Sequence, residues 1–544
     1  MEVQELLKLY AAHPQVTALD TLLKNDTSRN IFLKGLNGSG PAMTIASLFT
    51  KGRGSYVCVL NDQEEAGYFY HDLMQLTASN EVYFFPSAYR RAIKYGHVDP
   101  ANEILRTEVL SRLQDPDASF VIVTYPDALA ERVVAREVLK ENTLKISVGE
   151  KLDNMFVSDV LDEYGFEQVD YVYEPGQYAL RGSILDVFSF SYEFPYRIDF
   201  FGDEVETIRT FDVETQLSKE KLDSIYIVPE MSKNAKDSTS LLGSLPRNTF
   251  IAARDLAWCK ERIGSVWNDD PVVADEESFA DIDQMRKKLV RGEDFLREVL
   301  DFRRIHFGAR PMGTADATIH FSTQTQPIYH KNFDRVSESF HKYLDEGYTL
   351  YILSDQEKQA NRIRMIFEDR GDNIPFTAVN RTIHEGFADD TLRICFFTDH
   401  QLFDRFHKFN LKSDKARSGK ITLSLKELNQ FSQGDYIVHI DHGVGQFGGL
   451  VRTEVNGKMQ EAIKLIYQNN DIIFVSIHSL HKLSKYKGKE SGEPPKLSKL
   501  GTGAWEKMKE RTKAKVKDIA RDLILLYSKR KQETGFAYTP DSFM

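Results

Sequence analysis

The sequence predicts an α/β protein of several domains, and three observations lead to this expectation. The chain has 544 residues, several times the usual length of one domain, so we expect three to five compact units. Hydrophobic residues make up 41% and charged residues 28%, which is typical of globular proteins with several cores. Short apolar runs alternate with helical patterns in two separate stretches, and this rhythm is typical of parallel β-sheets.

The first stretch, residues 1–130, is expected to be a nucleotide-binding type of domain. Helical patterns cover Glu64–Leu76 and Glu103–Leu113. The strand candidates between and around them are Asn30–Lys34, Tyr56–Leu60, Glu81–Phe85 and Phe120–Thr124.

A glycine-rich loop follows the first strand and precedes a helical run. A working phosphate-binding loop reads G-x-x-x-x-G-K-[ST], in which the lysine and the hydroxyl hold the phosphates and Mg²⁺. Here Gly35, Gly38 and Gly40 keep the outline, but Pro41 replaces the lysine and Ala42 the hydroxyl residue. Proline also lacks a backbone donor, so we expect that this loop does not support hydrolysis of a nucleoside triphosphate. An ordinary turn before a helix that starts with proline is the alternative.

The middle of the chain predicts one inserted domain and a second α/β domain. We expect an inserted α+β domain at 131–213, with a hairpin around Gly202–Asp203, and a return to the first domain at 214–320. A charged helical stretch is expected at Phe279–His306. A small α/β domain is expected at 321–410, with elements at Val336–Glu346, Thr349–Leu353, Gln356–Arg370 and Arg393–Thr398.

The C-terminal part is expected to hold a small β-domain and a long helix. Linkers at 411–429 and 485–500 flank a β-rich stretch at 430–484, whose glycines suit the bends of a small barrel. A basic amphipathic helix is expected at 501–535. The whole chain has a net charge of -11, but residues 481–533 carry 16 Lys and Arg against 7 Asp and Glu. This basic stretch is either a solvated helix face or a contact for phosphate groups, for example through Lys507, Lys513 and Lys517.

The remaining chemistry-bearing residues do not form a recognisable site. Cys58, Cys259 and Cys395 are far apart, so we expect no disulfide framework and a reducing cytoplasm. His439 and His442 lack further ligands at metal spacing, so no metal is expected. The sequence has no apolar run of 18 residues, so no membrane-spanning segment is expected. Neither Ser39 with Asp399 and His400 nor any other set establishes a catalytic triad, so we expect no catalytic residue.

Three segments carry a family resemblance along nearly the whole chain. They are the loop Gly35–Ala42, the run Tyr178–Phe188 continuing into 196–216, and Val438–Phe447. Together they resemble the N-terminal half of bacterial transcription-repair coupling factors. The resemblance implies a helicase-like domain with a degenerate P-loop, an inserted domain like domain 2 of UvrB that binds UvrA, and a CarD-like RNA polymerase-interacting domain. The expected fold class is thus α/β multidomain, with a small SH3/Tudor-like β-barrel and a long C-terminal helix.

The resemblance also implies two protein-binding sites. UvrA is expected to contact Arg181, Arg197, Tyr171, Tyr173 and Phe188, which offer bidentate carboxylate contacts and aromatic surface. A sheet core with an internal salt bridge is the alternative for any of them. The strand around Ile463 resembles the family strand that pairs with the RNA polymerase β subunit. Its expected contact residues are Glu461, Ile463, Leu465 and Tyr467.

The family implies more than this sequence contains. Full-length members continue into an ATP-dependent motor that moves on DNA and pushes stalled RNA polymerase. We find no working phosphate loop here, so ATP and Mg are expected in sequence beyond Met544 and no cofactor in this segment. Two alternatives remain open: an active UvrB-like damage-binding ATPase, which Pro41 and Ala42 disfavour, and a CarD-like transcription regulator with a scaffold attached.

Overall fold

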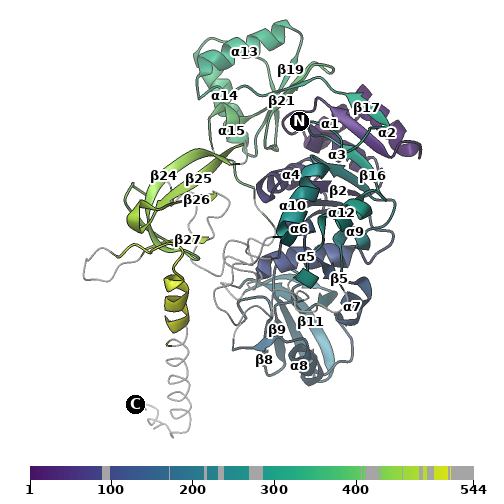
Figure 1. Cartoon of the computed structure of the whole chain (residues 1–544), viewed down its shortest axis with the longest axis vertical. Coiled ribbons are helices and arrows are strands. Elements are labelled where there is room, and N and C mark those ends of the chain that lie inside the picture. Colours follow the sequence, from purple (N-terminus) through teal and green to yellow (C-terminus); the bar gives the residue numbers. More distant parts are fainter. Residues whose placement is uncertain are drawn as a thin grey trace, which may run out of the picture. The chain divides into compact units, whose positions relative to one another are not determined.

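The computed structural model describes most of the chain as two compact units. One unit comprises Met1–Gly419 and the other Lys420–Met544 (Figure 1). The described residues are 1–88, 99–170, 172–213, 217–230, 238–268, 286–405, 407–409, 411, 428, 431–455, 458–476, 482–486, 495–512 and 515. No helix among them is both long and apolar enough to span a membrane.

The first lobe of the first unit is built on a parallel sheet of seven strands, in the order β17-β1-β16-β15-β2-β4-β3. Its strands are β1 (Asn30–Lys34), β2 (Tyr56–Val59), β3 (Val82–Phe84), β4 (Val121–Thr124), β15 (Phe250–Ala253), β16 (Arg303–His306) and β17 (Ala317–His320). The helices are α1 (Val3–Ala11), α2 (Pro14–Lys24), α3 (Gly40–Thr50), α4 (Gln63–Thr77), α5 (Pro100–Arg112), α6 (Pro126–Leu129), α7 (Arg136–Glu141), α9 (Leu241–Ser244), α10 (Leu256–Asn268) and α12 (Gly292–Val299). A short pair, β5 (Val133–Val134) with β14 (Ser238–Thr239), completes this lobe.

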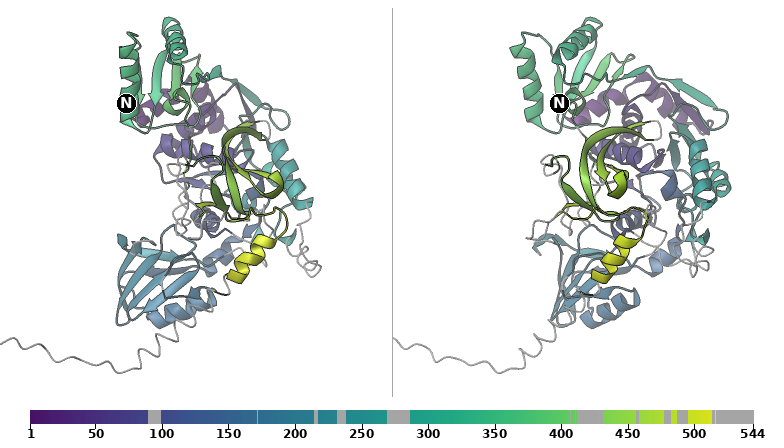
Figure 2. Two further views of the ribbon diagram at one scale, coloured as in Figure 1. Left: turned by 90° about the vertical axis from the view of Figure 1, so that its left-hand side faces the viewer. Right: turned by 60° about the vertical axis from the view of Figure 1, so that its left-hand side comes forward.

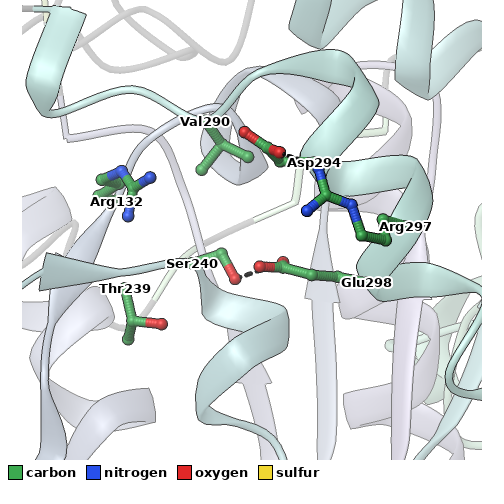
Figure 3. Close-up of a pocket in the computed structure, with 7 residues that line it drawn as sticks. All are labelled: Arg132, Thr239, Ser240, Val290, Asp294, Arg297 and Glu298. Atoms are coloured by element: carbon green, nitrogen blue, oxygen red, sulfur yellow. Dashed lines mark hydrogen bonds and ion pairs between the residues drawn. The ribbon is translucent and has the colours of Figure 1, made fainter.

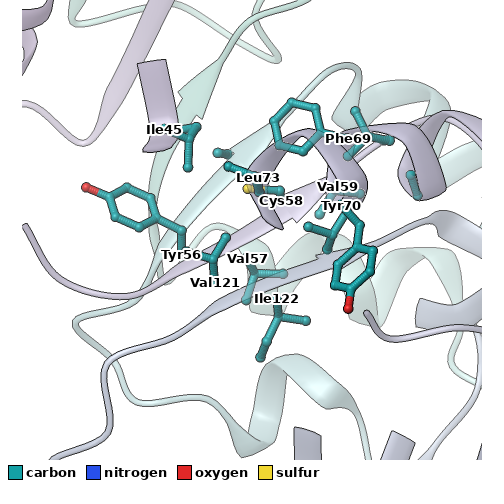
Figure 4. Close-up of a cluster of buried hydrophobic side chains, with 14 of the residues drawn as sticks. Ile45, Tyr56, Val57, Cys58, Val59, Phe69, Tyr70, Leu73, Val121 and Ile122 are labelled. Atoms are coloured by element: carbon teal, nitrogen blue, oxygen red, sulfur yellow. The ribbon is translucent and has the colours of Figure 1, made fainter. Parts of the chain in front are cut away.

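The centre of this sheet is buried on both faces, which explains why its strands are apolar without alternation. Every residue of β2 and β4 is buried. Side chains of β2 and β4, among them Cys58 and Ile122, belong to the same buried cluster as Ile45 of α3 and Leu73 of α4 (Figure 4).

One helix expectation in this lobe is wrong. The helical stretch expected at Phe279–His306 is α12 only from Gly292 to Val299, and Arg303–His306 is strand β16. Residues 269–285 lie outside the described part. The strand forms because β16 pairs with β1 on one side and β15 on the other, and this non-local pairing overrides the local helical pattern.

The inserted domain is a sheet of six strands in the order β12-β11-β10-β9-β8-β7 (Figure 2). Its elements are β6 (Leu144–Ser147), α8 (Asn154–Glu163), β7 (Glu167–Gln168), β8 (Gln177–Arg181), β9 (Ile184–Val187), β10 (Tyr196–Phe201), β11 (Glu204–Phe211), β12 (Ser218–Leu222) and β13 (Ser224–Ile227). Helix α8 packs Val157 and Leu161 against one face of the sheet.

The expected boundaries of this insert, 131–213, are wrong at both ends. Val133, Val134 and Leu139 belong to the core of the first lobe. Strands β12 and β13, expected to return to the first domain, belong to the insert, because β13 pairs with β6 and β12 pairs with β11. The antiparallel pair of β6 and β13 brings the chain in and out of the insert at one place.

The second lobe of the first unit is a smaller mixed sheet in the order β18-β21-β22-β19-β20. Its elements are β18 (Thr323–Thr325), α13 (Phe333–Asp345), β19 (Thr349–Leu353), α14 (Glu357–Asp369), β20 (Thr377–Val379), β21 (Phe387–Asp389), β22 (Ile394–Thr398) and α15 (Asp399–Leu402). Phe387 and Phe396 meet Tyr10 of α1 edge to face at 6.3 and 6.1 Å, so the two lobes share apolar core.

The second unit contains an antiparallel sheet in the order β26-β25-β24-β23-β27. Its strands are β23 (Tyr436–His439), β24 (Gly443–Val455), β25 (Lys458–Ile466), β26 (Ile472–Ser476) and β27 (Leu483–Lys485), with a 3-10 turn at Gln468–Asn470. The long helix expected at 501–535 is described from residue 504 to 512, and Trp505 fastens it by donating a 2.9 Å hydrogen bond to the carbonyl of Ile440. Most of the remaining expected helix lies outside the described residues.

Candidate functional site

The glycine-rich loop lies between β1 and α3, in the position of a phosphate loop, and is packed by the second lobe. Gly35 has a φ of 88° and its α-carbon faces the carbonyl of Phe321. Gly38 has a φ of 53°, and a β-carbon there would lie 3.0 Å from the carbonyl oxygens of Glu385 and Gly386. Both positions therefore need glycine, because the backbone is left-handed and another chain segment approaches closely.

Three backbone donors of this loop, those of Asn37, Ser39 and Gly40, have protein partners. Asn37 donates from its backbone to the Thr323 hydroxyl at 2.9 Å, and Ser39 donates to the carbonyl of Glu385 at 3.0 Å. Gly40 donates to the carbonyl of Asn37 at 3.0 Å, and Pro41 has no donor. Three of the amide groups available to surround a phosphate are thus engaged, two by the second lobe and one by the loop itself.

A buried carboxyl group holds the same junction together. Asp72 of α4 accepts a 2.6 Å hydrogen bond from the Ser39 hydroxyl and a 2.7 Å bond from the backbone N–H of His384. Burial raises the pKa of Asp72 to about 7, the charge of Glu385 adds to the rise, and the two hydrogen bonds oppose it.

This geometry explains why Ser39, Asp399 and His400 form no triad. The Ser39 hydroxyl donates to Asp72 and accepts from the backbone of Glu385. His400 donates from Nε2 to the carbonyl of His384 at 2.9 Å, and Asp399 accepts from Arg405 at 2.6 Å. The Ser39 hydroxyl is therefore held by Asp72 and Glu385 rather than aligned with an imidazole base.

In the inserted domain, Asp186 organises the arginines on the sheet face opposite α8. Asp186 is fully buried and accepts two hydrogen bonds from Arg197, Nε to Oδ1 at 2.7 Å and Nη2 to Oδ2 at 2.9 Å. Arg181 also pairs with Asp186 and donates to the carbonyl of Asp170 at 2.8 Å. The bonds to Asp186 are the main reason that the pKa of Arg197 is raised. Both arginines were expected at the site, and the structure assigns Arg197 mainly to an internal pair.

The expected aromatic contacts divide by burial. Tyr173 is 52% exposed and is available to a partner, whereas Phe188 has no exposed surface. Phe188 packs with Ile104 of α5 and Phe211, so its expected role as a contact residue is wrong. Tyr171 lies outside the described residues.

Among the described residues of the insert, Phe201 is the most exposed aromatic side chain, and it was not predicted as a contact residue. It is 79% exposed at the end of β10, before the Gly202–Asp203 turn. Met155 and Phe156 at the start of α8 are also more than half exposed. They lie toward the same end of the sheet, because Asn154 donates to the carbonyl of Gly182 and Phe200 donates to that of Ser183. Phe201 lies on the sheet face opposite α8, because Phe200 points into the core that α8 covers. We call Met155, Phe156 and Phe201, which share this end of the insert, the hairpin-end patch. The alternation of side chains along β10 could have predicted this exposure, because it directs Phe200 into the core and Phe201 to the outside.

In the second unit, the expected polymerase strand is not at an edge. Strand β25 pairs with β24 on one side and β26 on the other. Ile463, Leu465 and Tyr467 are buried, so they cannot be the contact side chains as expected. The side chain of Glu461 lies outside the described part. Strand β26 is an edge strand of this sheet, and its Ile472 and Phe474 are 46% and 50% exposed.

His439 of the second unit has a structural role. The backbone of Asp441 donates to Nδ1 of His439 at 3.0 Å. Burial, with smaller effects from His442, Lys482 and Lys509, lowers the pKa of His439 to about 3. In the described part of the chain, no group of three or more His, Cys, Asp or Glu residues is arranged to hold a metal ion.

A small cavity of about 230 Å³ lies between β14, α9 and α12 (Figure 3). Its charged groups are balanced: Arg297 pairs with Asp294 at 2.5 Å, and Ser240 donates to Glu298 at 2.5 Å. Arg132 donates to the carbonyls of Ser238 and Leu289. The bond from Ser240 to Glu298 links the start of α9, which follows the insert, to α12.

The two domains match known families. Residues 144–232 match the UvrB interaction domain, and residues 431–487 match the CarD-like/TRCF RID domain. The chain thus combines a stretch similar to a UvrB interaction domain with one similar to a CarD-like/TRCF RID domain.

Relatives that match nearly the whole chain are named transcription-repair-coupling factors. The protein of that name from Bacillus subtilis (strain 168) is 25% identical over 591 residues, covering 94% of this chain and 50% of the relative. The one from Staphylococcus aureus (strain bovine RF122 / ET3-1) is 25% identical over 613 residues, covering 97% and 52%. The resemblance predicted from the sequence is confirmed, and the chain spans about half the length of these relatives.

Proposed function

We propose that this chain is the adaptor part of a transcription-repair coupling factor. It binds UvrA through the inserted domain and RNA polymerase through the second unit, and so links polymerase stalled at DNA damage to nucleotide excision repair. The observation that carries this proposal is the presence of both matched domains on one chain. Because the relatives are about twice as long, we assign the ATP- and Mg-dependent movement on DNA, which displaces the polymerase, to the full-length protein in the cytoplasm.

The UvrA surface is proposed to be the hairpin-end patch together with Arg181 and Tyr173. Exposed aromatic and arginine side chains are enriched at protein interfaces. Arg181 keeps a third of its side-chain surface while Asp186 fixes its position, so it can meet a partner carboxylate with little loss of conformational freedom.

The polymerase surface is proposed to be β26. Edge strands present backbone donors and acceptors that can pair with a strand of another protein, and Ile472 with Phe474 add apolar contacts. We assign the β subunit of RNA polymerase as the owner of the added strand. The antiparallel sheet of the second unit supports an SH3/Tudor-like barrel as its fold, and Lys507 near the described helix start is the candidate contact to DNA.

The first lobe is proposed to be a helicase-like fold with a degenerate P-loop and no bound cofactor. The engaged amides of Asn37 and Ser39 support this proposal, as does the absence of the lysine and hydroxyl side chains. We assign no catalytic residue to this segment.

The experiment is binding of this chain to purified UvrA and to RNA polymerase, separately and together. The proposal requires that both bind and that neither excludes the other. Binding to polymerase alone would identify a CarD-like regulator, and ATP hydrolysis by the isolated chain would identify a UvrB-like ATPase.

A further inference from the structure

In the second unit, residues 498–509 are fastened to the small sheet, although they lie outside the matched stretch 431–487. Trp505 donates from Nε1 to the carbonyl of Ile440 at 2.9 Å, and Lys509 donates from Nζ to the same carbonyl at 2.9 Å. Both donors come from the first turns of the helix that begins at residue 504 (yellow in Figure 2). We call residues 498–509 the clamp.

A second set of contacts places Ser498 beside the start of β24. The backbone N–H of Ser498 donates to the carbonyl of Val444 at 2.9 Å, and the Ser498 hydroxyl accepts from the backbone N–H of Val444 at 2.9 Å. Strand β24 pairs with β23 at this point, whereas its pairing with β25 begins only at Gln446. Ser498 therefore occupies a stretch of sheet edge that the described strands leave open.

The clamp also reaches the turn that leads into β26. The carbonyl of Ser498 accepts a 3.2 Å hydrogen bond from the backbone N–H of Gln468, which begins the 3-10 turn between β25 and β26. The backbone N–H of Tyr467 closes this turn by donating to the carbonyl of Asp471 at 2.8 Å. The next residue, Ile472, begins β26. Hydrogen bonds therefore connect the clamp with the start of the edge strand.

Gly443 shows how closely the clamp approaches the sheet. Its φ is 81°, and a β-carbon there would lie 2.3 Å from the hydroxyl oxygen of Ser498 and 2.9 Å from the ring of Trp505. Both parts of the clamp thus meet the same backbone position, and only glycine leaves room for them. Gly434 has a similar φ of 98°, but none of its described neighbours lies within 4 Å of a β-carbon built there. The two glycines share the left-handed backbone and differ in their contact with the clamp.

We propose that the clamp couples the start of the basic helix to the edge strand β26. A strand of RNA polymerase added to β26 stabilises the docked helix, and release of the helix weakens the polymerase contact by the same factor. The coupling rests on the proposed role of β26 as the polymerase surface. It adds that the polymerase-binding domain extends to residue 509, beyond the matched stretch 431–487.

Trp505 is the anchor of the clamp, because its ring is half-buried and its indole N–H is bonded to the sheet. Without this anchor, Ser498 is held at Val444 and Gln468 by hydrogen bonds at a sheet edge, where water competes for the same groups. The turn at Gln468 then loses its partner more often, and β26 presents its backbone groups in a less fixed position. The sheet itself stays folded, because β26 pairs with β25 along its full length.

Hydrogen–deuterium exchange of the full chain tests the clamp in the absence of polymerase. Peptides that cover residues 440–447, 466–470 and 495–503 report the amides that make the clamp contacts. Trp505→Ala should raise their exchange rates at least about tenfold, because an aromatic anchor commonly contributes more than that factor. Met508→Ala changes an exposed side chain of the same helix and should leave the rates unchanged.

Two glycine substitutions test the same contact from the side of the sheet. Gly443→Ala places a methyl group against Ser498 and Trp505, so it should raise the same exchange rates as Trp505→Ala does. Gly434→Ala introduces a comparable backbone strain without touching the clamp, and its clamp peptides should exchange like those of the wild type. If neither Trp505→Ala nor Gly443→Ala raised the rates, the clamp would be overturned.

Titration of the same chains with RNA polymerase tests the coupling. Trp505→Ala should bind polymerase at least about fivefold more weakly than Met508→Ala, which is the lower end of common coupling factors. Phe474→Arg changes β26 itself and should lose the polymerase while the clamp stays protected from exchange in the free chain. Loss of polymerase in Phe474→Arg together with wild-type affinity in Trp505→Ala would overturn the coupling and leave the proposed surface standing. Polymerase binding by a folded Phe474→Arg variant, or none by the wild-type chain, would overturn the surface and the coupling with it.

Discussion

His13 donates a 3.0 Å hydrogen bond from Nε2 to Oδ2 of Asp389, and neither side chain has any exposed surface. Nδ1 of His13 accepts from the backbone of Gln15 and so caps α2. Oδ1 of Asp389 accepts from the backbone N–H groups of Thr391 and Leu392. Because Nδ1 accepts, the ring is neutral with its proton on Nε2, and it fastens the N-terminal helices to the second lobe.

The first prediction concerns this pair. Among the described residues, His13 is the only side-chain donor to the buried carboxylate of Asp389. His13→Ala removes this donor and leaves a cavity, so we expect a loss of about 3 kcal/mol in the free energy of unfolding. Urea unfolding of the full chain measures it, with His320→Ala at an exposed position as the control. Equal stability of the two variants would show that the pair contributes nothing.

The second prediction separates the core of the insert from its surface. Phe201→Ala removes the exposed aromatic of the hairpin-end patch, and we expect at least tenfold weaker UvrA binding with unchanged thermal stability. Phe188→Ala removes a fully buried side chain and should cost about 3 kcal/mol of stability. Titration with UvrA measures the affinity of each variant, and melting curves measure its stability. Wild-type UvrA affinity in Phe201→Ala would exclude the hairpin-end patch.

The third prediction distinguishes the two faces of the small sheet. Phe474→Arg places a charge on exposed β26 and should abolish RNA polymerase binding while the sheet stays folded. Ile463→Arg buries a charge between β24 and β26 and should unfold the sheet. Polymerase pull-down together with circular dichroism separates these results. Intact binding in a folded Phe474→Arg variant would place the polymerase elsewhere.

Much of the fold could be predicted because its strands are marked by local composition. Strands β1 and β19 have the predicted bounds Asn30–Lys34 and Thr349–Leu353. Both are apolar runs with clear turn residues at their ends, and both are buried in sheets covered by helices. Elements whose conformation depends on distant pairing were missed, as with β16.

The site residues were harder to predict because burial depends on strand order. The pattern around Ile463 identifies a strand, but whether that strand lies at the centre or at an edge depends on where β26 pairs, some ten residues further along the chain. Phe188 and Phe201 are both aromatic residues at strand ends, and only the packing of α5 on one of them decides which faces a partner. The segment that packs into the phosphate loop is even further away in the sequence, since Glu385 is 346 residues from Ser39. No local pattern could therefore predict this contact.

The last prediction tests whether the loop is disabled by its residues or by its surroundings. The double substitution Pro41→Lys with Ala42→Thr restores the sequence motif of a working phosphate loop. We nevertheless expect no saturable micromolar ATP binding. The reason is that the Glu385 carbonyl still accepts from the amide of Ser39, and the Thr323 hydroxyl from that of Asn37. A phosphate group cannot displace them without breaking the junction at Asp72 as well. Calorimetric titration with ATP and Mg²⁺ gives the measurement, and a melting curve shows whether the variant is folded, since residues 41 and 42 are buried. Ala42→Thr alone is the milder control, because it adds only a hydroxyl group to the start of α3. Tight ATP binding by the folded double variant would mean that the lost side chains alone disable the loop, and that the packing of residues 384–386 follows from that loss rather than adding to it.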